Sequence, residues 1–146
     1  MVKIKMERVA GDYGFEVSDE AGKTLLTDNS PDGGGIGNGF RPMQLLLAAL
    51  GSCSAIDIVS ILKKQRQTIE NFKISITGVR EDKEIPALWK QAHMSFYLAG
   101  SIQDDKAIKA CTLSVEKYCS VAETLRRSGA IISWDLFIND QPIKIS

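Results

Sequence analysis

The chain has 146 residues, of which 44% are hydrophobic and 25% are charged, a composition typical of a soluble globular protein of one domain. Eighteen basic and eighteen acidic residues cancel, so no excess of positive charge favours nucleic acid or an anionic membrane as a partner. Residues 1–8 contain no continuous apolar segment of the signal-peptide kind, so we expect a single domain over residues 1–146, located in the cytoplasm.

The N-terminal third of the chain predicts three short strands and a loop. Apolar and polar residues alternate over residues 2–9, and residues 13–17 and 23–27 continue as strands with turns between them. Residues 28–39 are rich in glycine and are expected to form a mobile loop. Nucleotide binding is not indicated, because Phe40-Arg41-Pro42 follows where a phosphate loop ends in Lys-Ser or Lys-Thr.

A long apolar helix is predicted from Pro42 to about Gln67. Pro42 suits the first helical position because its missing N–H costs nothing there. Apolar residues cover nearly every face, which is typical of a central, buried helix. The longest apolar stretch, Met43 to Leu50, is interrupted by Gln44 and is too short to span a bilayer.

The rest of the chain adds strands and helices that do not strictly alternate. The patterns predict strands over 72–79 and 89–98, a helix over 104–118, a second helix over 119–129 with a capping box at its start, and a last strand over 130–138. Strands that cluster in this way favour an α+β domain with antiparallel sheets around a central helix.

Two of the three cysteines lie in similar local settings. Cys53 lies within Gly51-Ser52-Cys53-Ser54 of the long helix, and Cys119 lies within Tyr118-Cys119-Ser120 at the start of a later helix. They are 66 positions apart, so only the fold can bring them together. Two such thiols suggest a nucleophile and a resolving partner in sulfur redox chemistry. The alternative, which the pattern leaves open, is that both are small buried side chains.

The remaining titratable candidates are weaker. Cys119 could be the more acidic thiol of the pair, because a helix N-terminus lowers a thiol pKa. Cys111 matches no motif and is expected to be a buried small residue. His93, the single histidine, points out of a strand, and no cysteine or histidine lies at ligand spacing, so neither zinc nor a Cys–His acyl-transfer site is indicated.

Three segments together resemble the OsmC/Ohr superfamily, and most closely its YhfA-like branch. They are Pro42 to Leu47, Gly51 to Leu62 and Glu116 to Val121, in this order and with the right separation. The resemblance implies an OsmC-like fold, with antiparallel sheets around long central helices and two subunits intertwined as a homodimer. It also implies thiol-dependent reduction of organic hydroperoxides, with Cys53 as the peroxidatic residue, Cys119 as the resolving residue, an external thiol as reductant, and no metal or organic cofactor.

The chain departs from the family where the first cysteine is activated. In the hydroperoxide reductases an arginine stabilises the thiolate, and a glutamate directly after the helix-opening proline holds that arginine. Here Met43 follows Pro42, and Gln44 stands where the YhfA-like pattern has an acid. Arg41 is the candidate to stabilise the Cys53 thiolate, and a solvated loop arginine is the alternative interpretation.

Asp57 lies one helical turn beyond Cys53 on the same face, and we expect it to hold Arg41 or an arginine of a partner subunit. The apolar helix around Cys53 favours alkyl or fatty-acyl peroxides over hydrogen peroxide. The rival function is a non-catalytic relative that binds a small apolar or acyl ligand in the same interface pocket. The absence of an acid at Met43 and Gln44 favours the ligand-binding function, whereas the paired thiols of Cys53 and Cys119 favour the peroxidase.

Overall fold

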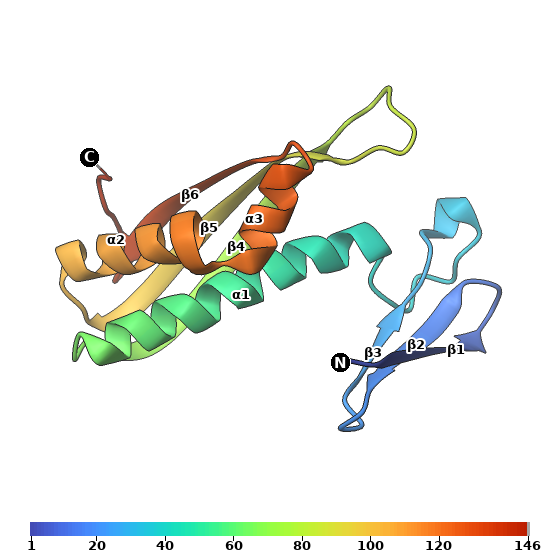
Figure 1. Cartoon of the computed structure of the whole chain (residues 1–146), viewed down its shortest axis with the longest axis horizontal. Coiled ribbons are helices and arrows are strands. Elements are labelled where there is room, and N and C mark those ends of the chain that lie inside the picture. The colour runs from blue at the N-terminus through green and yellow to red at the C-terminus, as the bar shows by residue number, and fades with distance from the viewer. Residues whose placement is uncertain (146) are drawn as a thin grey trace. The chain divides into compact units, whose positions relative to one another are not determined.

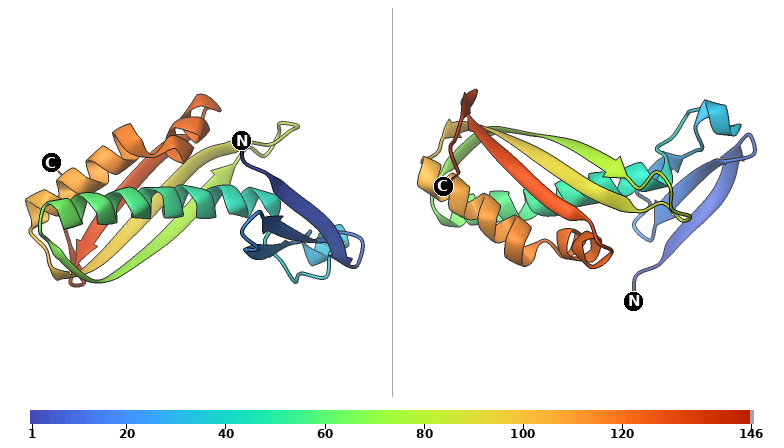
Figure 2. Two further views of the ribbon diagram at one scale, coloured as in Figure 1. Left: turned by 60° about the horizontal axis from the view of Figure 1, so that its bottom comes forward. Right: turned by 90° about the horizontal axis from the view of Figure 1, so that it is seen from above.

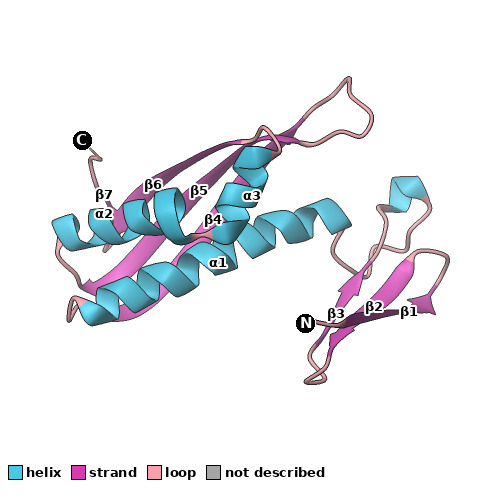
Figure 3. Ribbon diagram, viewed as in Figure 1, coloured by secondary structure: helices cyan, strands magenta, loops and turns pink. Residues whose placement is uncertain are grey.

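The computed structural model describes residues 1–145, and the chain divides into two compact units, Met1–Leu46 and Leu47–Ser146. Each unit contains one sheet, drawn in magenta in Figure 3. The strand orders are β1-β2-β3 in the first sheet and β4-β5-β6-β7 in the second. The mixture of sheets and helices confirms the α+β fold class, whereas a single domain over the whole chain stays a prediction.

The first unit is built on an antiparallel meander of three strands. These are β1 (Ile4–Ala10), β2 (Gly14–Asp19) and β3 (Thr24–Thr27), each within about two residues of its predicted bounds. A three-stranded sheet is too small to bury its own apolar side chains, and many remain more than a third exposed. The most exposed of them on these strands are Ile4, Met6, Val9 and Leu25.

The glycine-rich segment is organised around the buried carboxylate of Asp28, which is 3% exposed. A short 3₁₀ helix, η1 (Pro31–Gly33), lies within it. The carboxylate accepts hydrogen bonds from the backbone N–H groups of Asn29, Ile36 and Asn38. Burial by itself raises the pKa of Asp28, but hydrogen bonds from the backbone at Asn29, Asn38, Ile36 and Gly37 together hold it below its usual value. One carboxylate thus ties several backbone groups of this segment together, and the expectation that the loop is mobile stays a prediction.

The sheet of the second unit mixes antiparallel and parallel pairs. β4 (Thr68–Arg80) pairs antiparallel with β5 (Trp89–Ser101), which pairs parallel with β6 (Ile131–Ile138). A two-residue strand, β7 (Gln141–Pro142), adds antiparallel to β6. The prediction of purely antiparallel sheets was wrong here, because the chain crosses back through helices between β5 and β6 and so re-enters in the same direction.

Helices lie against one face of this sheet, as Figures 1 and 2 show. They are α1 (Pro42–Lys64), which begins in the first unit, α2 (Asp104–Leu113), the π-helical turn η2 (Ser114–Tyr118) and α3 (Ser120–Arg127). All were predicted, except that the helix expected over 104–118 changes to π-helical geometry in its last turn. Alternate residues of β5 face the helices and are buried, namely Ala92, Met94, Phe96 and Leu98.

Gly51 lets α1 approach β4 closely in the middle of the helix. A Cβ atom at this position would lie 2.5 Å from Cδ1 of Ile76, which is on β4. Glycine costs about 1 kcal/mol of helix propensity relative to alanine, and the close packing against the strand explains why it is present. The contact lies two residues from Cys53, so it sets the depth at which this thiol is held.

α1 is buried along one face only. Its buried residues are Leu50, Gly51, Ser54, Ile58 and Leu62. On the opposite side Ile56 is 68% exposed, and Leu46 is 40% exposed. The prediction of a helix buried on every side is therefore wrong for a single copy of the chain.

Of the helices described over residues 1–145, α1 is long and apolar enough to cross a membrane, judged by length and composition alone. Its most apolar window has a mean hydropathy of 2.1, so the apolar stretch is longer than the Met43–Leu50 segment considered in the sequence. The core helix of a soluble protein passes the same test. Of that window 28% is buried in the single chain, along the face that packs against β4.

Candidate functional site

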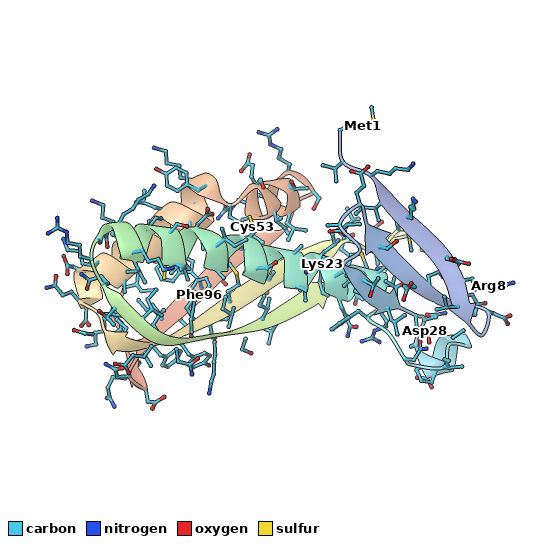
Figure 4. All side chains as sticks on the ribbon, turned by 90° about the horizontal axis from the view of Figure 1, so that it is seen from below. Met1, Arg8, Lys23, Asp28, Cys53 and Phe96 are labelled. Carbon is cyan, nitrogen blue, oxygen red and sulfur yellow. The ribbon has the colours of Figure 1, made fainter. Side chains whose placement is uncertain are left out.

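The fold brings Cys53 and Cys119 together. Cys53 lies on α1, labelled in Figure 4, and is half-buried, whereas Cys119 lies between η2 and α3 and is only 3% exposed. The serine that follows each cysteine reaches the sulfur of the other, so the two thiols lie close together. Both are free thiols in the structure. The expectation that the fold joins these two distant positions is confirmed, and the roles of the two thiols stay predictions.

Each cysteine is followed by a serine whose hydroxyl reaches the other cysteine. Ser54 Oγ donates to Cys119 Sγ at 3.5 Å, and Ser120 Oγ lies 4.0 Å from Cys53 Sγ. The arrangement is reciprocal because α1 and the start of α3 present the same Cys-Ser dipeptide to each other. A hydroxyl beside a sulfur stabilises the thiolate, since it donates to the charged form.

Cys119 caps the N-terminus of α3. Its sulfur accepts a hydrogen bond from the backbone N–H of Ala122 at 3.4 Å, and the thiol points toward the carbonyl oxygen of Leu50 at 4.0 Å. Burial raises the pKa of Cys119, and the neighbouring Cys53 raises it further, while the bonds from Ser54 and Ala122 lower it. The net direction is upward. The prediction of an acidic Cys119 was therefore wrong, because loss of hydration outweighs the N-terminal cap.

Ser114 ties the segment that carries Cys119 to the helix that carries Cys53. Its fully buried hydroxyl lies 3.1 Å from the carbonyl oxygen of Ser54 and 3.4 Å from Oδ2 of Asp57, and it can donate to either. Its own carbonyl accepts the backbone N–H of Cys119 at 2.8 Å, five residues on. This bond closes the π-helical turn η2, and such turns often occur at functional sites.

Asp57 contacts Ser114 in the second unit, and this is the hydrogen bond that the structure gives its carboxylate. Arg41 belongs to the first unit. The pairing of Asp57 with Arg41, or with an arginine of a partner subunit, therefore stays a prediction.

Gln44 has a clear structural role at the start of α1. Its Oε1 accepts the backbone N–H of Arg41 at 3.0 Å, and the carbonyl of Arg41 in turn accepts the backbone N–H of Gln44 at 2.9 Å. The bond from the Arg41 N–H to the Gln44 side chain is one of the two bonds of a capping box, and Glu and Gln can both accept it. The residue that replaces the acid of the YhfA-like pattern thus keeps the helix start intact while it removes a negative charge.

The other candidates lie away from the thiol pair. Cys111 is fully buried on α2, and burial raises its pKa from 9.0 to about 12, which confirms the prediction of a buried small residue. His93 lies between the inward-facing Ala92 and Met94, so it faces the opposite side of the sheet. There its Nδ1 lies 2.8 Å from Ser133 Oγ. Within residues 1–145 no cluster of three or more His, Cys, Asp or Glu side chains could hold a metal ion.

Comparisons with known proteins agree with this fold and with the position of the thiols. The family model for OsmC-like proteins matches residues 33–135, which include both cysteines of the pair. The chain belongs to the OsmC-like family.

Individual relatives are similar over different parts of the chain. Protein YhfA of Escherichia coli strain K12 is 42% identical over 88 residues, a segment that covers 60% of this chain and 65% of that protein. A crystal structure of a hypothetical protein from Aquifex aeolicus VF5 has a TM-score of 0.78 and 28% identity, and the match covers 95% of this chain and 98% of that one. A crystal structure from Legionella pneumophila, described as an organic hydroperoxide resistance protein OsmC, has a TM-score of 0.71 at 15% identity, over 94% and 96% of the two chains. At that identity the likeness shows the fold alone.

Sequence reasoning missed three serines of the site. Ser54 and Ser120 contact the sulfurs, and Ser114 contacts the Ser54 carbonyl and Asp57. A signal for two of them was present, because the Cys-Ser dipeptide occurs twice. No comparable signal marked Ser114, since its role depends on a π-helical turn that local sequence patterns do not predict.

Proposed function

We propose that the protein is a thiol-dependent peroxidase that reduces organic hydroperoxides through Cys53 and Cys119. The observation that carries the proposal is the contact between a half-exposed thiol and a buried one. A structural pair of core residues would not need a path from solvent to one sulfur. The description of the Legionella pneumophila relative as an organic hydroperoxide resistance protein supports the same chemistry.

Cys53 is assigned the peroxidatic role because it is the more exposed of the two. Its thiolate attacks the terminal oxygen of the hydroperoxide, and the O–O bond breaks. Cys53 becomes a sulfenic acid, and the alkoxide takes up the proton that the Cys53 thiol released and leaves as the alcohol. Cys119, whose pKa is raised by burial, stays a neutral thiol near pH 7, and a neutral thiol is a poor nucleophile toward peroxide. Arg41 is the candidate that stabilises the Cys53 thiolate.

Cys119 is assigned the resolving role because its sulfur faces Cys53 from the start of α3. It attacks the sulfenic sulfur, a disulfide forms, and water leaves with the hydroxyl of the sulfenic acid and the proton of the thiol. Two molecules of an external thiol then reduce the disulfide. The two protein thiols are thereby restored, and the net reaction converts hydroperoxide and two thiols into alcohol, water and a disulfide.

The test is to treat the purified, reduced protein with cumene hydroperoxide and to map its disulfides by mass spectrometry after digestion. We expect a Cys53–Cys119 disulfide and loss of two free thiols, with Cys111 still free. Cys119→Ser should stop at the sulfenic acid of Cys53, which dimedone traps. Cys111→Ser is the matched control and should behave as the unsubstituted protein does.

Peroxide consumption that is equal in the unsubstituted protein and in Cys53→Ser would overturn the proposal. A protein that forms no disulfide with any organic hydroperoxide would do so as well, and would leave the ligand-binding relative as the better interpretation.

The assembly we propose is a homodimer in a compartment that keeps thiols reduced, the cytoplasm. The strands of the first unit and the outer face of α1 expose large apolar side chains that a second copy could cover. Ile56 and Leu46 represent this surface on α1. An odd number of widely spaced cysteines is not the disulfide framework of a small secreted domain, and this supports the proposed compartment.

A further inference from the structure

The turn that leads into Cys119 has a shifted hydrogen-bond pattern. In an α-helix the backbone N–H of Cys119 would bond to the carbonyl of Val115, four residues earlier. Here it bonds to the carbonyl of Ser114, five residues earlier, at 2.8 Å. The carbonyl of Val115 therefore loses its helical partner, although Val115 is a fully buried residue.

Arg126 of α3 supplies a new partner for this carbonyl. Its Nη1 donates to the carbonyl oxygen of Val115 at 2.8 Å. Its Nη2, which is inaccessible to solvent, lies 3.1 Å from Oε2 of Glu116 and forms an ion pair with it. The guanidinium group thus holds two consecutive residues of η2, and it does so from the helix that begins directly after Cys119.

The bond from Arg126 bears on the geometry of η2, because a buried carbonyl without a partner costs free energy. Without this donor, the carbonyl of Val115 could regain a partner only by taking back the N–H of Cys119. That exchange would return the turn to α-helical geometry and rotate Cys119 about the helix axis. The sulfur would then leave the position in which Ser54 and Ala122 donate to it.

We propose that Arg126 is a positioning residue for the resolving step, because it keeps η2 in π-helical geometry and so holds Cys119 beside Cys53. The inference rests on the proposed function, in which the Cys119 thiol attacks the sulfenic sulfur of Cys53, a disulfide forms and water leaves. Over residues 1–145 the guanidinium group contacts the turn and neither sulfur. It therefore acts through the backbone and not on the reacting atoms.

The two chemical steps should respond differently to the loss of Arg126. The attack on the hydroperoxide is made by Cys53, which α1 carries, so its rate should not change. The attack on the sulfenic acid is made by Cys119, which η2 and α3 position, so its rate should fall. A residue that only stabilised the fold would not separate the two steps in this way.

The test mixes the reduced protein with cumene hydroperoxide and follows both steps. Loss of the Cys53 thiol measures the first step, and disulfide formation in competition with dimedone measures the second. Arg126→Met keeps a long side chain but has no donor, and it should slow the second step by about tenfold, the lower end of the range for a lost charged hydrogen bond. Arg126→Lys should slow it by about threefold, because an ammonium group can donate to Val115 but lacks the planar fork that also holds Glu116.

Arg127→Met is the matched control, because it removes an equal charge from the next position. The Arg127 side chain is 80% exposed, and its guanidinium group pairs with Glu123 within α3. This variant should keep both rates. Equal resolving rates in Arg126→Met and Arg127→Met would overturn the inference, and so would a first step that slows as much as the second.

Alkylation of Cys111, which is fully buried, reports whether each variant is folded. If Arg126→Met does not fold, the comparison of Arg126→Lys with Arg127→Lys decides by the same criterion. Slower resolution in Arg126→Lys supports the inference, and equal resolution overturns it.

Oxidation by diamide separates this inference from the proposed function. Diamide oxidises two neighbouring thiols to a disulfide and is itself reduced to a hydrazine, so no hydroperoxide is needed. Slower disulfide formation in Arg126→Met than in Arg127→Met supports the inference even if hydroperoxide oxidises neither cysteine. Equal rates of disulfide formation in these two variants overturn the inference and leave the peroxidase proposal standing.

Discussion

At the scale of single residues, burial gives the two sulfurs different environments, although both belong to a Cys-Ser dipeptide. Ser54 donates to the sulfur of Cys119, which is buried, whereas Ser120 lies further from the sulfur of Cys53. Without the hydroxyl of Ser54, burial would raise the pKa of Cys119 further. The hydroxyl of Ser54 therefore lowers the pKa of Cys119 against the effect of burial.

Ser54→Ala should raise the pKa of Cys119 further, because the alanine cannot donate to the thiolate. The measurement is the pH dependence of iodoacetamide alkylation in a Cys53→Ser, Cys111→Ser background, where Cys119 is the remaining thiol. Ser52→Ala is the control, since the Ser52 hydroxyl donates to the carbonyl of Ala48 within α1. Curves that coincide with and without Ser54 would show that its hydroxyl does not stabilise the thiolate.

Cys111 should make the fold sensitive to alkaline pH. Burial raises its pKa from 9.0 to about 12, so the folded state binds the thiol proton more tightly than the unfolded state does. The resulting stability is fully present below pH 9 and is lost as the pH rises toward 12. Urea unfolding should show that the stability advantage of the unsubstituted protein over Cys111→Ala shrinks by about 1.4 kcal/mol between pH 8 and pH 10. A constant difference would mean that the thiol does not titrate in this way.

At the scale of the elements, α1 and β4 meet through two glycines with unequal tolerance for a side chain. A Cβ at Gly51 would meet the flexible end of Ile76, whereas a Cβ at Gly78 would lie 2.6 Å from the indole ring of Trp89 and 3.1 Å from Leu47. The indole ring is 8% exposed and rigid, so it cannot move away as an isoleucine methyl can. An added side chain is therefore less tolerated at Gly78 than at Gly51.

Gly78→Ala should lower the free energy of unfolding by about 2 kcal/mol, because the added methyl group overpacks the interface. Gly51→Ala should cost less than about 1 kcal/mol, since alanine gains about that much helix propensity and Ile76 can rotate. Urea unfolding of the two variants measures both values. Equal losses, or a larger loss for Gly51→Ala, would contradict this ranking.

At the scale of the whole molecule, the sequence predicted the elements well and their pairing less well. Alternation and helical periodicity located β1 to β6 and the helices, because these signals are local. The capping box expected at the start of α3 is not formed, since Cys119 is the N-cap and its sulfur accepts the backbone N–H of Ala122. The parallel pairing of β5 with β6 and the two-residue β7 depend on contacts between distant segments, which composition and periodicity do not record. The same holds for the site, where two cysteines were found from the sequence and Ser114 was not.

The proposed homodimer predicts that the exposed face of α1 is an interface. Ile56→Lys should shift the native mass measured by light scattering from two chains toward one, because it places a charge on that face. Ile131→Lys is a matched control, since Ile131 is 64% exposed and Ile56 is 68% exposed. A stable monomer of the unsubstituted protein at micromolar concentration would contradict the dimer itself.

The contact between α1 and the start of α3 also links redox state to heat resistance. A bond between Cys53 and Cys119 would close a loop of 66 positions, and the chain entropy lost by the unfolded state would stabilise the oxidised protein by about 4 kcal/mol. Calorimetry should therefore find that the oxidised protein melts roughly 10 °C higher than the reduced protein. An unchanged melting temperature would mean that the disulfide raises the free energy of the folded state through strain by as much as it raises that of the unfolded state through lost chain entropy. If the shift is found, oxidation by peroxide would itself protect the protein against unfolding.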